Sequence, residues 1–429
     1  MTTTGEMPGT QGLPGDVLDD LTWWTRPAAE RDATFAWLRA HEPRPYVPEL
    51  DLTGAARGGG FWALTRLDDV REVSRRPADF CSGRGSLIFD QPPSLREFRG
   101  SIIDMDNPEH ARQRRIVSRG FTPKAVAALV DDITRTSREV ISAVAGRGEC
   151  DFVTEVAALL PLRIVNNMLG IPRSEERFLF EQTNILMGAS DPEYVPDQTP
   201  RSVARAVRGA GEAMSGLLEE LARDRIRDPQ DDLVSSLVAA QEEENLTPTE
   251  LATFFNLLVG AGNETTRNAL AHGLSAITRF PQQRELWRSD LDRYTPGAVE
   301  ELLRWASPVL YMRRTVARDG VRLGEQRFDE GDKVVLWYRS ANQDEAYFDD
   351  ATSFQVTRDP NPHVTFGAPG PHHCLGANLA RVELAIAFRT LFELLPDIEA
   401  TAEPDLLRSN FLHGVKHLPA RFTPTTTSA

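Results

Sequence analysis

Residues 366–376 constrain this chain more than any other part of its sequence. They read Phe-Gly-Ala-Pro-Gly-Pro-His-His-Cys-Leu-Gly, with three glycines and two prolines among eleven residues, and an apolar helical pattern follows from Asn378. This pattern predicts a tight turn that places Cys374 at the start of a helix. Backbone N–H groups and the helix dipole stabilise a thiolate there, and the thiolate is the form that binds metal. A lone cysteine on such a loop is more often an ordinary buried or reactive residue, so the interpretation depends on what accompanies it.

The overall composition is typical of a soluble globular protein. Of the 429 residues, 41% are hydrophobic and 26% charged, and the net charge of −15 disfavours binding to nucleic acid or to an anionic membrane. Cys81, Cys150 and Cys374 are too few for a disulfide framework, which favours a reducing, cytoplasmic location, and we interpret the first two as structural. No signal peptide is evident, and the longest apolar stretches, such as 254–262, are too short for a membrane anchor.

Helical periodicity dominates the chain, and strand patterns are few. The small, polar ends, residues 1–15 and 423–429, are expected to be flexible. The expected helices include 28–41, 123–145 and 201–227, and the expected strands are 60–65 and a hairpin over 321–336 that turns at 329–332.

Residues 257–266 predict an apolar helix interrupted by glycine (Leu-Leu-Val-Gly-Ala-Gly-Asn-Glu-Thr-Thr). Glycine costs up to about 1 kcal/mol relative to alanine inside a helix, so Gly260 and Gly262 indicate a kink or the close approach of another element. An acid and an alcohol, Glu264 and Thr265, follow directly. A capping or structural threonine is the alternative, and the adjacent carboxylate argues against it.

Two further pairs of charged residues have helical spacing. Glu301 and Arg304 are three residues apart and should share one helix face. His110 and Arg114 are one turn apart, and together they can hold a carboxylate group of a ligand. Each pair taken alone is also typical of a solvated helix surface.

Taken in order, these features resemble the bacterial cytochromes P450, the heme-thiolate monooxygenases. The matching landmarks are the His-x-x-x-Arg helix, the Gly-x-Glu-Thr-Thr helix, Glu-x-x-Arg, the segment Ser-Ala-Asn-Gln-Asp-Glu at 340–345 and the cysteine loop. The similarity extends over residues 62–419. It implies a single-domain fold over residues 16–422, mainly α with a small β lobe, that encloses heme b between the glycine-containing helix and the cysteine loop. The implied reaction inserts one oxygen of O2 into a C–H bond.

The family's catalytic residues carry over position by position. Cys374 corresponds to the proximal iron ligand. Glu264 and Thr265 resemble the acid–alcohol pair that routes protons during oxygen activation. Ala261 and Gly262, in the same helix, are expected to contact the cofactor.

The family's charged residues carry over in the same way. Glu301 and Arg304 resemble its internal ion pair, which has a structural role. The residues expected to bind the heme propionates are His110, Arg114, Arg314 and His372, although the adjacent Arg313 leaves the register of that strand open.

The cysteine loop departs from the family pattern at one position. The aromatic residue usually lies seven residues before the cysteine, whereas Phe366 lies eight before Cys374, as if Pro369 were inserted. Gly370 keeps its place four residues before the cysteine, so the ligand geometry should survive, while the packing of Phe366 is open. The same expansion occurs in a subgroup of the family that resembles the actinobacterial sterol and methyl-branched lipid hydroxylases. Related antibiotic-pathway oxidases share much of the pattern.

The positions that should line the distal pocket are mostly apolar, which predicts a hydrophobic substrate. Gly260 stands where a larger residue is usual in the family, so a bulky sterol, terpenoid or branched lipid is expected. The alternative is an amino acid or other antibiotic-pathway intermediate bound to a carrier protein. The pocket residues are Leu257, Gly260, Val309, Tyr311 and Leu412, together with the variable region 88–103.

The chain has no room for a flavin or iron–sulfur domain. Two electrons from NAD(P)H are therefore expected to arrive through a separate ferredoxin reductase and ferredoxin. Arg112, Arg115 and Arg119 are the expected docking face for an acidic ferredoxin.

Other classes of protein compete with this interpretation. A zinc hydrolase would use His363, His372, His373 and Cys374, but consecutive residues cannot easily converge on one tetrahedral ion. A non-catalytic heme carrier or sensor has no need of the Glu264–Thr265 pair, and peroxygenases of the family tend to lose it.

Overall fold

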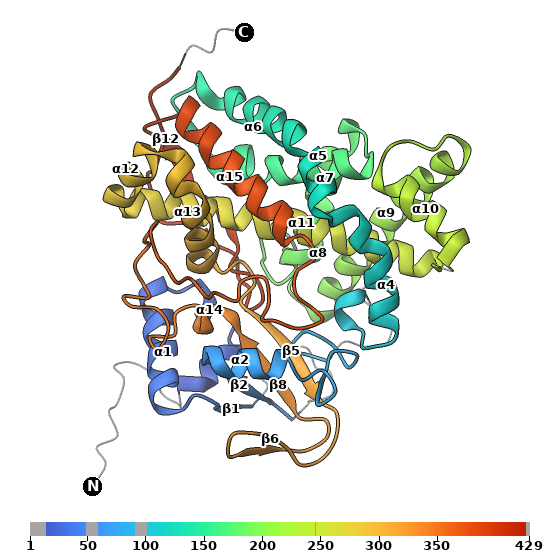
Figure 1. Ribbon diagram of the computed structural model, residues 1–429, viewed down its shortest axis with the longest axis vertical. Helices are drawn as coiled ribbons and strands as arrows, with labels where there is room; N and C mark the ends of the chain where they lie inside the picture. Colours follow the sequence, from blue (N-terminus) through green and yellow to red (C-terminus); the bar gives the residue numbers. More distant parts are fainter. Residues whose placement is uncertain (1–13, 49–58, 91–100, 245, 426–429) are drawn as a thin grey trace.

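A 32-residue helix, α11 (Pro248–Arg279), crosses the centre of the molecule, and other helices pack around it (Figure 1). Its start is fixed by a capping box. The Thr247 side chain accepts a hydrogen bond from the Glu250 N–H, and the Glu250 carboxylate accepts one from the Thr247 N–H. The computed structural model describes residues 14–48, 59–90, 101–244 and 246–425.

Helices form most of the described chain, as the apolar periodicity predicts. The predicted helix over 28–41 is confirmed, and the one over 201–227 begins one residue earlier. The predicted helix over 123–145 is divided at Leu129, whose N–H bonds to the Val126 carbonyl in a tight turn. Besides α11, the helices are α1 (Ala28–His41), α2 (Leu67–Ser74), α4 (Glu109–Val117), α5 (Pro123–Ala128), α6 (Val130–Ala145), α7 (Leu159–Leu169), α8 (Glu176–Gly188), α9 (Pro200–Arg227), α10 (Leu233–Glu244), α12 (Pro281–Ser289), α13 (Leu291–Ala306), α14 (Tyr338–Ala341) and α15 (Ala377–Leu394).

The principal sheet lies at one end of the molecule, opposite α6 and α15 (Figure 1). β2 and β8 are parallel, and the other neighbours are antiparallel. Its strand order is β1 (Tyr46–Val47), β2 (Phe61–Leu64), β8 (Lys333–Trp337), β5 (Tyr311–Val316) and β3 (Phe80–Cys81). Smaller sheets pair β6 (Val321–Leu323) with β7 (Gln326–Phe328), β10 (Asp405–Leu406) with β11 (Val415–His417), and β12 (Pro419–Arg421) with both β4 (Glu149–Asp151) and β9 (Glu399–Ala400).

The predicted hairpin over 321–336 is wrong in its turn. β6 pairs with β7 across Gly324, whereas residues 329–332 lead into β8, which pairs with β5 in the principal sheet. Gly324 and Gly331 both have positive φ, at 58° and 92°, so both connections contain a left-handed glycine. The apolar strand β8 is buried along its length, and it satisfies its backbone between β2 and β5.

Structure extends slightly beyond the predicted domain limits. Pro14–Asp19 forms a short 3-10 helix, and the Thr423 N–H and hydroxyl donate to Asp397. The Thr425 N–H donates to the Ala145 carbonyl at 2.9 Å. The remainder of the predicted flexible ends, residues 1–13 and 426–429, lies outside the described residues. Within the described part of the chain, no helix combines the length and apolar character that crossing a membrane requires.

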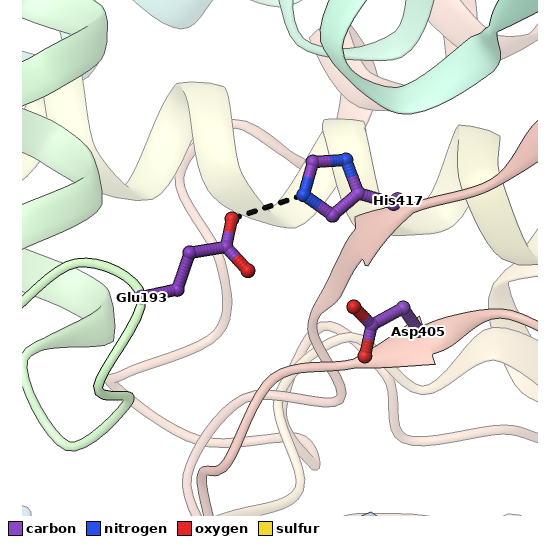
Figure 2. A group of neighbouring side chains, drawn as sticks. All are labelled: Glu193, Asp405 and His417. Atoms are coloured by element: carbon purple, nitrogen blue, oxygen red, sulfur yellow. Dashed lines mark hydrogen bonds and ion pairs between the residues drawn. The ribbon is translucent and has the colours of Figure 1, made fainter.

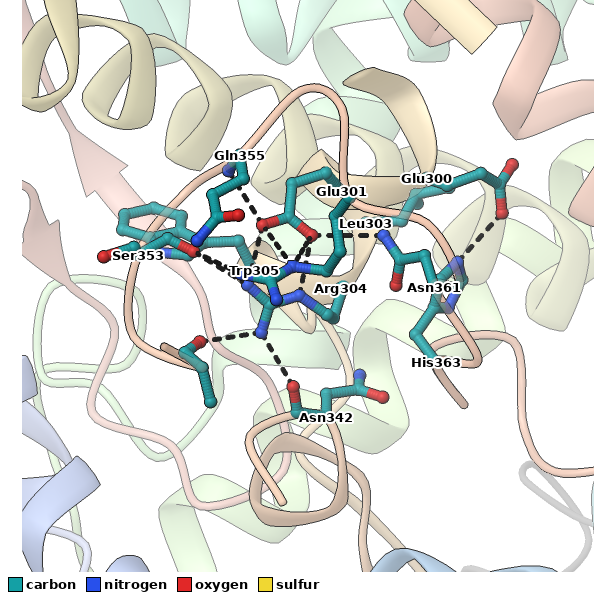
Figure 3. Close-up of polar contacts among 12 residues, drawn as sticks. Glu300, Glu301, Leu303, Arg304, Trp305, Asn342, Ser353, Gln355, Asn361 and His363 are labelled. Carbon is teal, nitrogen blue, oxygen red and sulfur yellow. Dashed lines mark hydrogen bonds and ion pairs between the residues drawn. The ribbon is translucent and has the colours of Figure 1, made fainter. Parts of the chain in front are cut away.

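The predicted ion pair between Glu301 and Arg304 is completely buried (Figure 3). Arg304 Nε donates to Glu301 Oε2 at 2.7 Å, and both side chains are 0% exposed. The remaining donors and acceptors of the pair are also used, so α13 fixes the long segment that leads to the cysteine loop. Arg304 donates to the carbonyls of Asn342, Ala351 and Ser353, and Glu301 accepts from Gln355, Arg358 and Asn361.

Replacing one partner of this pair should strongly destabilise the protein. Glu301→Gln leaves the buried Arg304 and Arg358 without a carboxylate, and breaking such a pair costs about 3–5 kcal/mol. Urea unfolding of the heme-bound protein measures the loss. Glu181→Gln is the control, because its exposed pair with Arg177 should contribute less than about 1 kcal/mol. Equal losses in the two variants would contradict a structural role of the buried pair.

Candidate functional site

The cysteine loop forms the tight turn that the sequence predicts. The Cys374 N–H donates to the Phe366 carbonyl at 2.8 Å, three residues before α15 begins. Gly367 has a φ of 81°, in the region that favours glycine. A Cβ at Gly370 would come within 2.3 Å of the Ser74 carbonyl, so only glycine lets the loop lie this close to the end of α2.

The one-residue expansion of the loop leaves Phe366 well packed. The Arg381 guanidinium lies over the Phe366 ring, 4.5 Å from its centroid. Arg381 is itself held by Glu300 at 2.6 Å, and Glu300 also contacts His363 at 2.9 Å. Burial raises the pKa of Glu300, but its bonds to His363 and Arg381 outweigh burial and lower that pKa to about 2.

The Cys374 side chain keeps accessible surface, so its sulfur is open to a ligand. Burial raises the pKa of the Cys374 thiol, against the Gly376 N–H, Arg114 and Arg381, which lower it. The expected stabilisation of the thiolate by a backbone N–H at the helix start is present, from Gly376, although desolvation is the larger and opposing effect. A bound metal deprotonates a coordinating thiol outright, so this sulfur fits a metal ligand.

The four side chains expected to bind propionates are gathered beside the cysteine loop. The rings of His110 and His372 are 4.2 Å apart, and the Arg114 guanidinium donates to the His373 carbonyl at 2.7 Å. Burial, followed by Arg314, His110 and Arg114, lowers the pKa of His372 to about 3. His110 Nε2 is buried and has no hydrogen-bond partner. Two guanidinium groups beside neutral histidines, one with an unpaired ring nitrogen, fit an anionic ligand, as the two heme propionates would be.

The register of β5 favours Arg314 over Arg313 for this cluster. Adjacent strand residues point to opposite faces of a sheet. Arg313 pairs with Asp90 at 2.7 Å and donates to the Leu87 carbonyl, on the other side from the cysteine loop. Arg314 instead lines a small cavity together with His372.

Removing the Arg314 charge should weaken heme retention. A hydrogen bond to a charged group contributes about 1.5–3 kcal/mol, so Arg314→Gln should speed heme loss about tenfold or more. Transfer of heme to excess apomyoglobin measures this rate. Arg313→Gln is the matched control and should lower the stability of the fold with little change in heme loss. The opposite ranking would assign the propionate contact to Arg313.

One face of α11 keeps accessible surface, while most of the helix is buried. Leu257, Ala261 and Thr265, spaced four residues apart, are half-buried, and the Thr265 hydroxyl donates to the Ala261 carbonyl at 2.7 Å. The helix continues through both glycines. A Cβ at Gly262 would come within 2.9 Å of the Val165 side chain in α7, so the structure supports close approach as the reason for this glycine.

The structure separates the predicted acid from the predicted alcohol. Glu264 directly precedes Thr265, so its side chain points about 100° away around the helix, and it is 5% exposed. Burial raises the pKa of Glu264, and the neighbouring Arg267 opposes that rise. Arg267 donates to Glu264 Oε1 at 3.0 Å. Sequence reasoning missed Arg267, although its spacing from Glu264 is the same as that of Arg304 from Glu301.

The predicted pocket residues divide into accessible and enclosed groups. Val309 is half-buried and forms a β-bridge with Leu412, whose side chain is 1% exposed. The prediction for Tyr311 is wrong, because its ring is 0% exposed and packs on Trp337 and Phe411 in an aromatic cluster.

The space beside Gly260 is bordered by α8. A Cβ at this position would meet the Met187 sulfur of α8 at 3.5 Å, an ordinary contact distance. Met187 therefore borders the room that this glycine leaves, and Leu257 is the accessible apolar residue one turn earlier. Residues 91–100 of the predicted variable region lie outside the described residues.

The histidines of the cysteine loop do not form a zinc site. His363 bonds to Glu300, and His372 packs against His110. Among the described residues, the side chains that converge with metal-binding geometry are Glu193, Asp405 and His417, far along the chain from this loop. The structure therefore contradicts the zinc hydrolase alternative.

Comparisons with known proteins agree with the motifs. The family model described as "Cytochrome P450" matches residues 60–396. A methyl-branched lipid omega-hydroxylase of Mycobacterium tuberculosis is 44% identical over 423 residues, 98% of this chain and 97% of that protein. A steroid C26-monooxygenase of Mycobacterium bovis is 38% identical, over 96% of this chain and 93% of its own. A solved Mycobacterium marinum cytochrome P450 in complex with pseudoionone matches with a TM-score of 0.89 and 37% identity, covering 96% of this chain and 100% of its own. The resemblance stated from the sequence is thereby confirmed, including its sterol and branched-lipid subgroup.

Proposed function

This chain belongs to the cytochrome P450 family and is a monooxygenase, and from that premise we propose that it hydroxylates a sterol or methyl-branched lipid. The apolar, accessible face of α11 supports the proposal. Leu257, Leu258 and Ala261 are half-buried on a helix whose other faces are packed, and Val309 adds a further accessible apolar side chain. Two relatives that align over nearly the whole chain are named for a methyl-branched lipid and for a steroid.

The enzyme uses heme b and O2, with electrons from reductase partners. When bound, a thiolate-ligated heme supplies the oxidising chemistry that inserts oxygen into a C–H bond. In the proposed arrangement Cys374 ligates the iron, and His110, Arg114, Arg314 and His372 bind the propionates. Thr265 holds a hydroxyl on the accessible face of α11, where it can donate and accept protons. Glu264 is the proposed source of those protons and must leave Arg267 to supply them.

The outer face of α4 is the proposed contact for an acidic ferredoxin. Arg114 of this helix bonds to the carbonyl of the loop residue His373, so α4 lies against the cysteine loop. Arg115 and Arg119 are exposed beside it. Arg112 forms an ion pair with Glu250 and therefore belongs to the helix packing more than to the docking face. In this proposal the ferredoxin receives its electrons from NAD(P)H through a reductase in the cytoplasm. The three free cysteines agree with that reducing location.

The spectrum of the carbon monoxide complex tests the iron ligand. With a Cys374 thiolate, the Soret band of the reduced complex should lie far to the red, and Cys374→Ala should abolish that shift. Cys81→Ala is the control, because this half-buried thiol is distant in sequence from the cysteine loop and should leave the spectrum unchanged. A histidine-type spectrum in the wild-type protein would overturn the proposal.

Substrate-induced spin shifts test the substrate class. Sterols, methyl-branched fatty acids, straight-chain fatty acids and carrier-protein-bound aminoacyl groups form the panel. Each buried methylene contributes about 0.8 kcal/mol, so branched lipids and sterols should bind more tightly than smaller members of the panel. Product analysis then shows whether a C–H bond has become C–OH. Tighter binding and turnover of the carrier-bound aminoacyl group would replace the lipid proposal with the antibiotic-pathway alternative.

A further inference from the structure

The hairpin of β10 and β11 is held at its base by charged side chains that water reaches. Asp405 and His417 lie there beside Glu193, which belongs to the segment after α8 (Figure 2). His417 Nε2 lies 3.0 Å from Glu193, and the Lys416 ammonium lies 3.1 Å from Glu193 and 3.5 Å from Asp405. The three side chains of Figure 2 are 38–55% exposed, so each of these pairs should contribute little to stability.

The loop of the same hairpin, residues 407–414, ends in the protein interior. Leu412 and His413 are only 1% and 5% exposed. The Leu407 N–H donates to the Gly414 carbonyl at 2.9 Å and closes the loop. A Cβ at Gly414 would come within 2.7 Å of the Leu407 Cβ, so this close approach requires glycine directly after His413.

Every polar group of His413 has a partner. Its N–H donates to the Pro308 carbonyl at 2.9 Å, and its carbonyl accepts from His272 Nε2 at 2.9 Å. Its Nδ1 lies 2.6 Å from the Ala306 carbonyl. Because a carbonyl oxygen only accepts, Nδ1 carries the proton, and Nε2 of the neutral ring accepts from Arg31 Nη2 at 3.4 Å.

A second arginine lies beside the same ring without bonding to it. Arg339 Nη1 is 3.4 Å from His413 Nδ1, and with Nδ1 protonated this is a contact and not a hydrogen bond. The Arg339 guanidinium donates instead to Asp32 Oδ1 at 2.7 Å. His413 therefore joins the end of α13 to α1, which supplies Arg31.

The central helix holds the hairpin through two residues one turn apart. The rings of His272 and His413 stack with their centroids 3.8 Å apart and their planes at 22°. Burial lowers the pKa of His272 to about 3 and the pKa of His413 well below its usual value, so both rings are uncharged near neutral pH. Asn268 Oδ1 accepts from the Val415 N–H at 3.0 Å. The tip of the hairpin is thus fixed to the helix that also carries Thr265.

His413 directly follows a residue of the proposed substrate pocket. Leu412 forms an antiparallel β-bridge with Val309, and the neighbouring Leu310 N–H donates to the Phe411 carbonyl at 2.8 Å. Bridged residues of antiparallel segments carry their side chains on the same side, so Leu412 packs behind Val309, which keeps accessible surface. We call these two residues the Val309–Leu412 wall. A displacement of His413 would move this wall.

We propose that His413 is a positioning residue that determines which C–H bond of the lipid is oxidised. By fixing the tip of the hairpin to α13 and α11, it sets the distance between the Val309–Leu412 wall and the accessible face of α11, which carries Ala261 and Thr265. A lipid chain between these surfaces is oxidised at the carbon that this width admits. The inference rests on the proposed function, because it requires the lipid to lie between Val309 and α11.

Replacement of the His413 ring tests the proposal. His413→Leu removes both ring nitrogens, so the ratio of the principal hydroxylated product of a methyl-branched fatty acid to its positional isomers should fall about 3- to 10-fold, the equivalent of one hydrogen bond. His413→Asn places an amide N–H where Nδ1 was and should restore the ratio to within about twofold. A ratio in His413→Asn as low as in His413→Leu would overturn the role of the bond to Ala306.

A second variant leaves the His413 side chain intact. His272→Phe keeps an aromatic ring against His413 and removes the donor to its carbonyl, so it should lower the product ratio in the same direction. An unchanged ratio in His272→Phe, or in a folded His413→Leu, would overturn the inference.

Two controls separate placement of the wall from stability. Thr295→Val removes a buried hydrogen bond from Trp287 Nε1, 3.0 Å long, and should lower the urea midpoint while leaving the product ratio unchanged. Asp405→Asn loosens the exposed base of the same hairpin and should also leave the ratio unchanged. A shift in Thr295→Val as large as in His413→Leu would show that the ratio follows stability, which contradicts the proposal.

Val309→Ala distinguishes failure of this inference from failure of the proposed function. It alters the wall directly, so His413→Leu should add little in the Val309→Ala background, and fully additive changes would overturn the inference. If Val309→Ala changes the ratio while His413→Leu and His272→Phe do not, this inference alone is wrong. If lipids cause no spin shift, or Val309→Ala leaves the ratio unmoved, the proposed lipid pocket fails and the inference fails with it.

Discussion

Charge that is removed from water must find an opposite charge or enough hydrogen bonds, and this constraint organises the molecule. Glu301 and Arg304 meet it completely within the chain, and their pairing fixes the segment that leads to the cysteine loop. The group around Cys374 does not balance itself in this way. Arginines and histidines gather beside a thiol whose pKa burial raises, and one buried histidine nitrogen has no partner. A heme has the complementary charges, an iron cation for the sulfur and two propionates for the cations.

The central helix serves two purposes because its faces differ. The accessible face carries Thr265 and apolar side chains, whereas Glu264, on the buried side, bonds to Arg267. Neighbouring helices pack against the rest of α11, which makes it a rigid support for both. The acid and the alcohol are adjacent in sequence and yet point in different directions. The proposed proton relay on this helix therefore needs a change in the partners of Glu264, which are Arg267 and Asn263.

Local patterns predicted much of the site. The turn before Cys374 follows from glycine positions that are sterically required, and the Glu301–Arg304 pair follows from helical spacing. The helix over 28–41 follows from apolar periodicity. Where the prediction was wrong, a long-range contact outweighed a local preference. Which of the two glycine turns after β5 closes a hairpin depends on the pairing of β8 with β2 and β5, which the local sequence does not encode. The Tyr311 ring packs in an aromatic cluster and not in a pocket.

The sequence by itself determined the family, the cysteine loop and the set of charged residues, because each depends on residue types at short, regular spacings. Only the tertiary structure decided how those residues are partnered. It placed Arg314 beside His372 and Arg313 on the opposite face of β5. It also paired the Glu264 carboxylate with the Arg267 guanidinium, on a different side of the helix from Thr265. It also brought Tyr194 to Arg267 across 73 residues. Such contacts depend on which helices and loops pack together, and no local spacing encodes that arrangement.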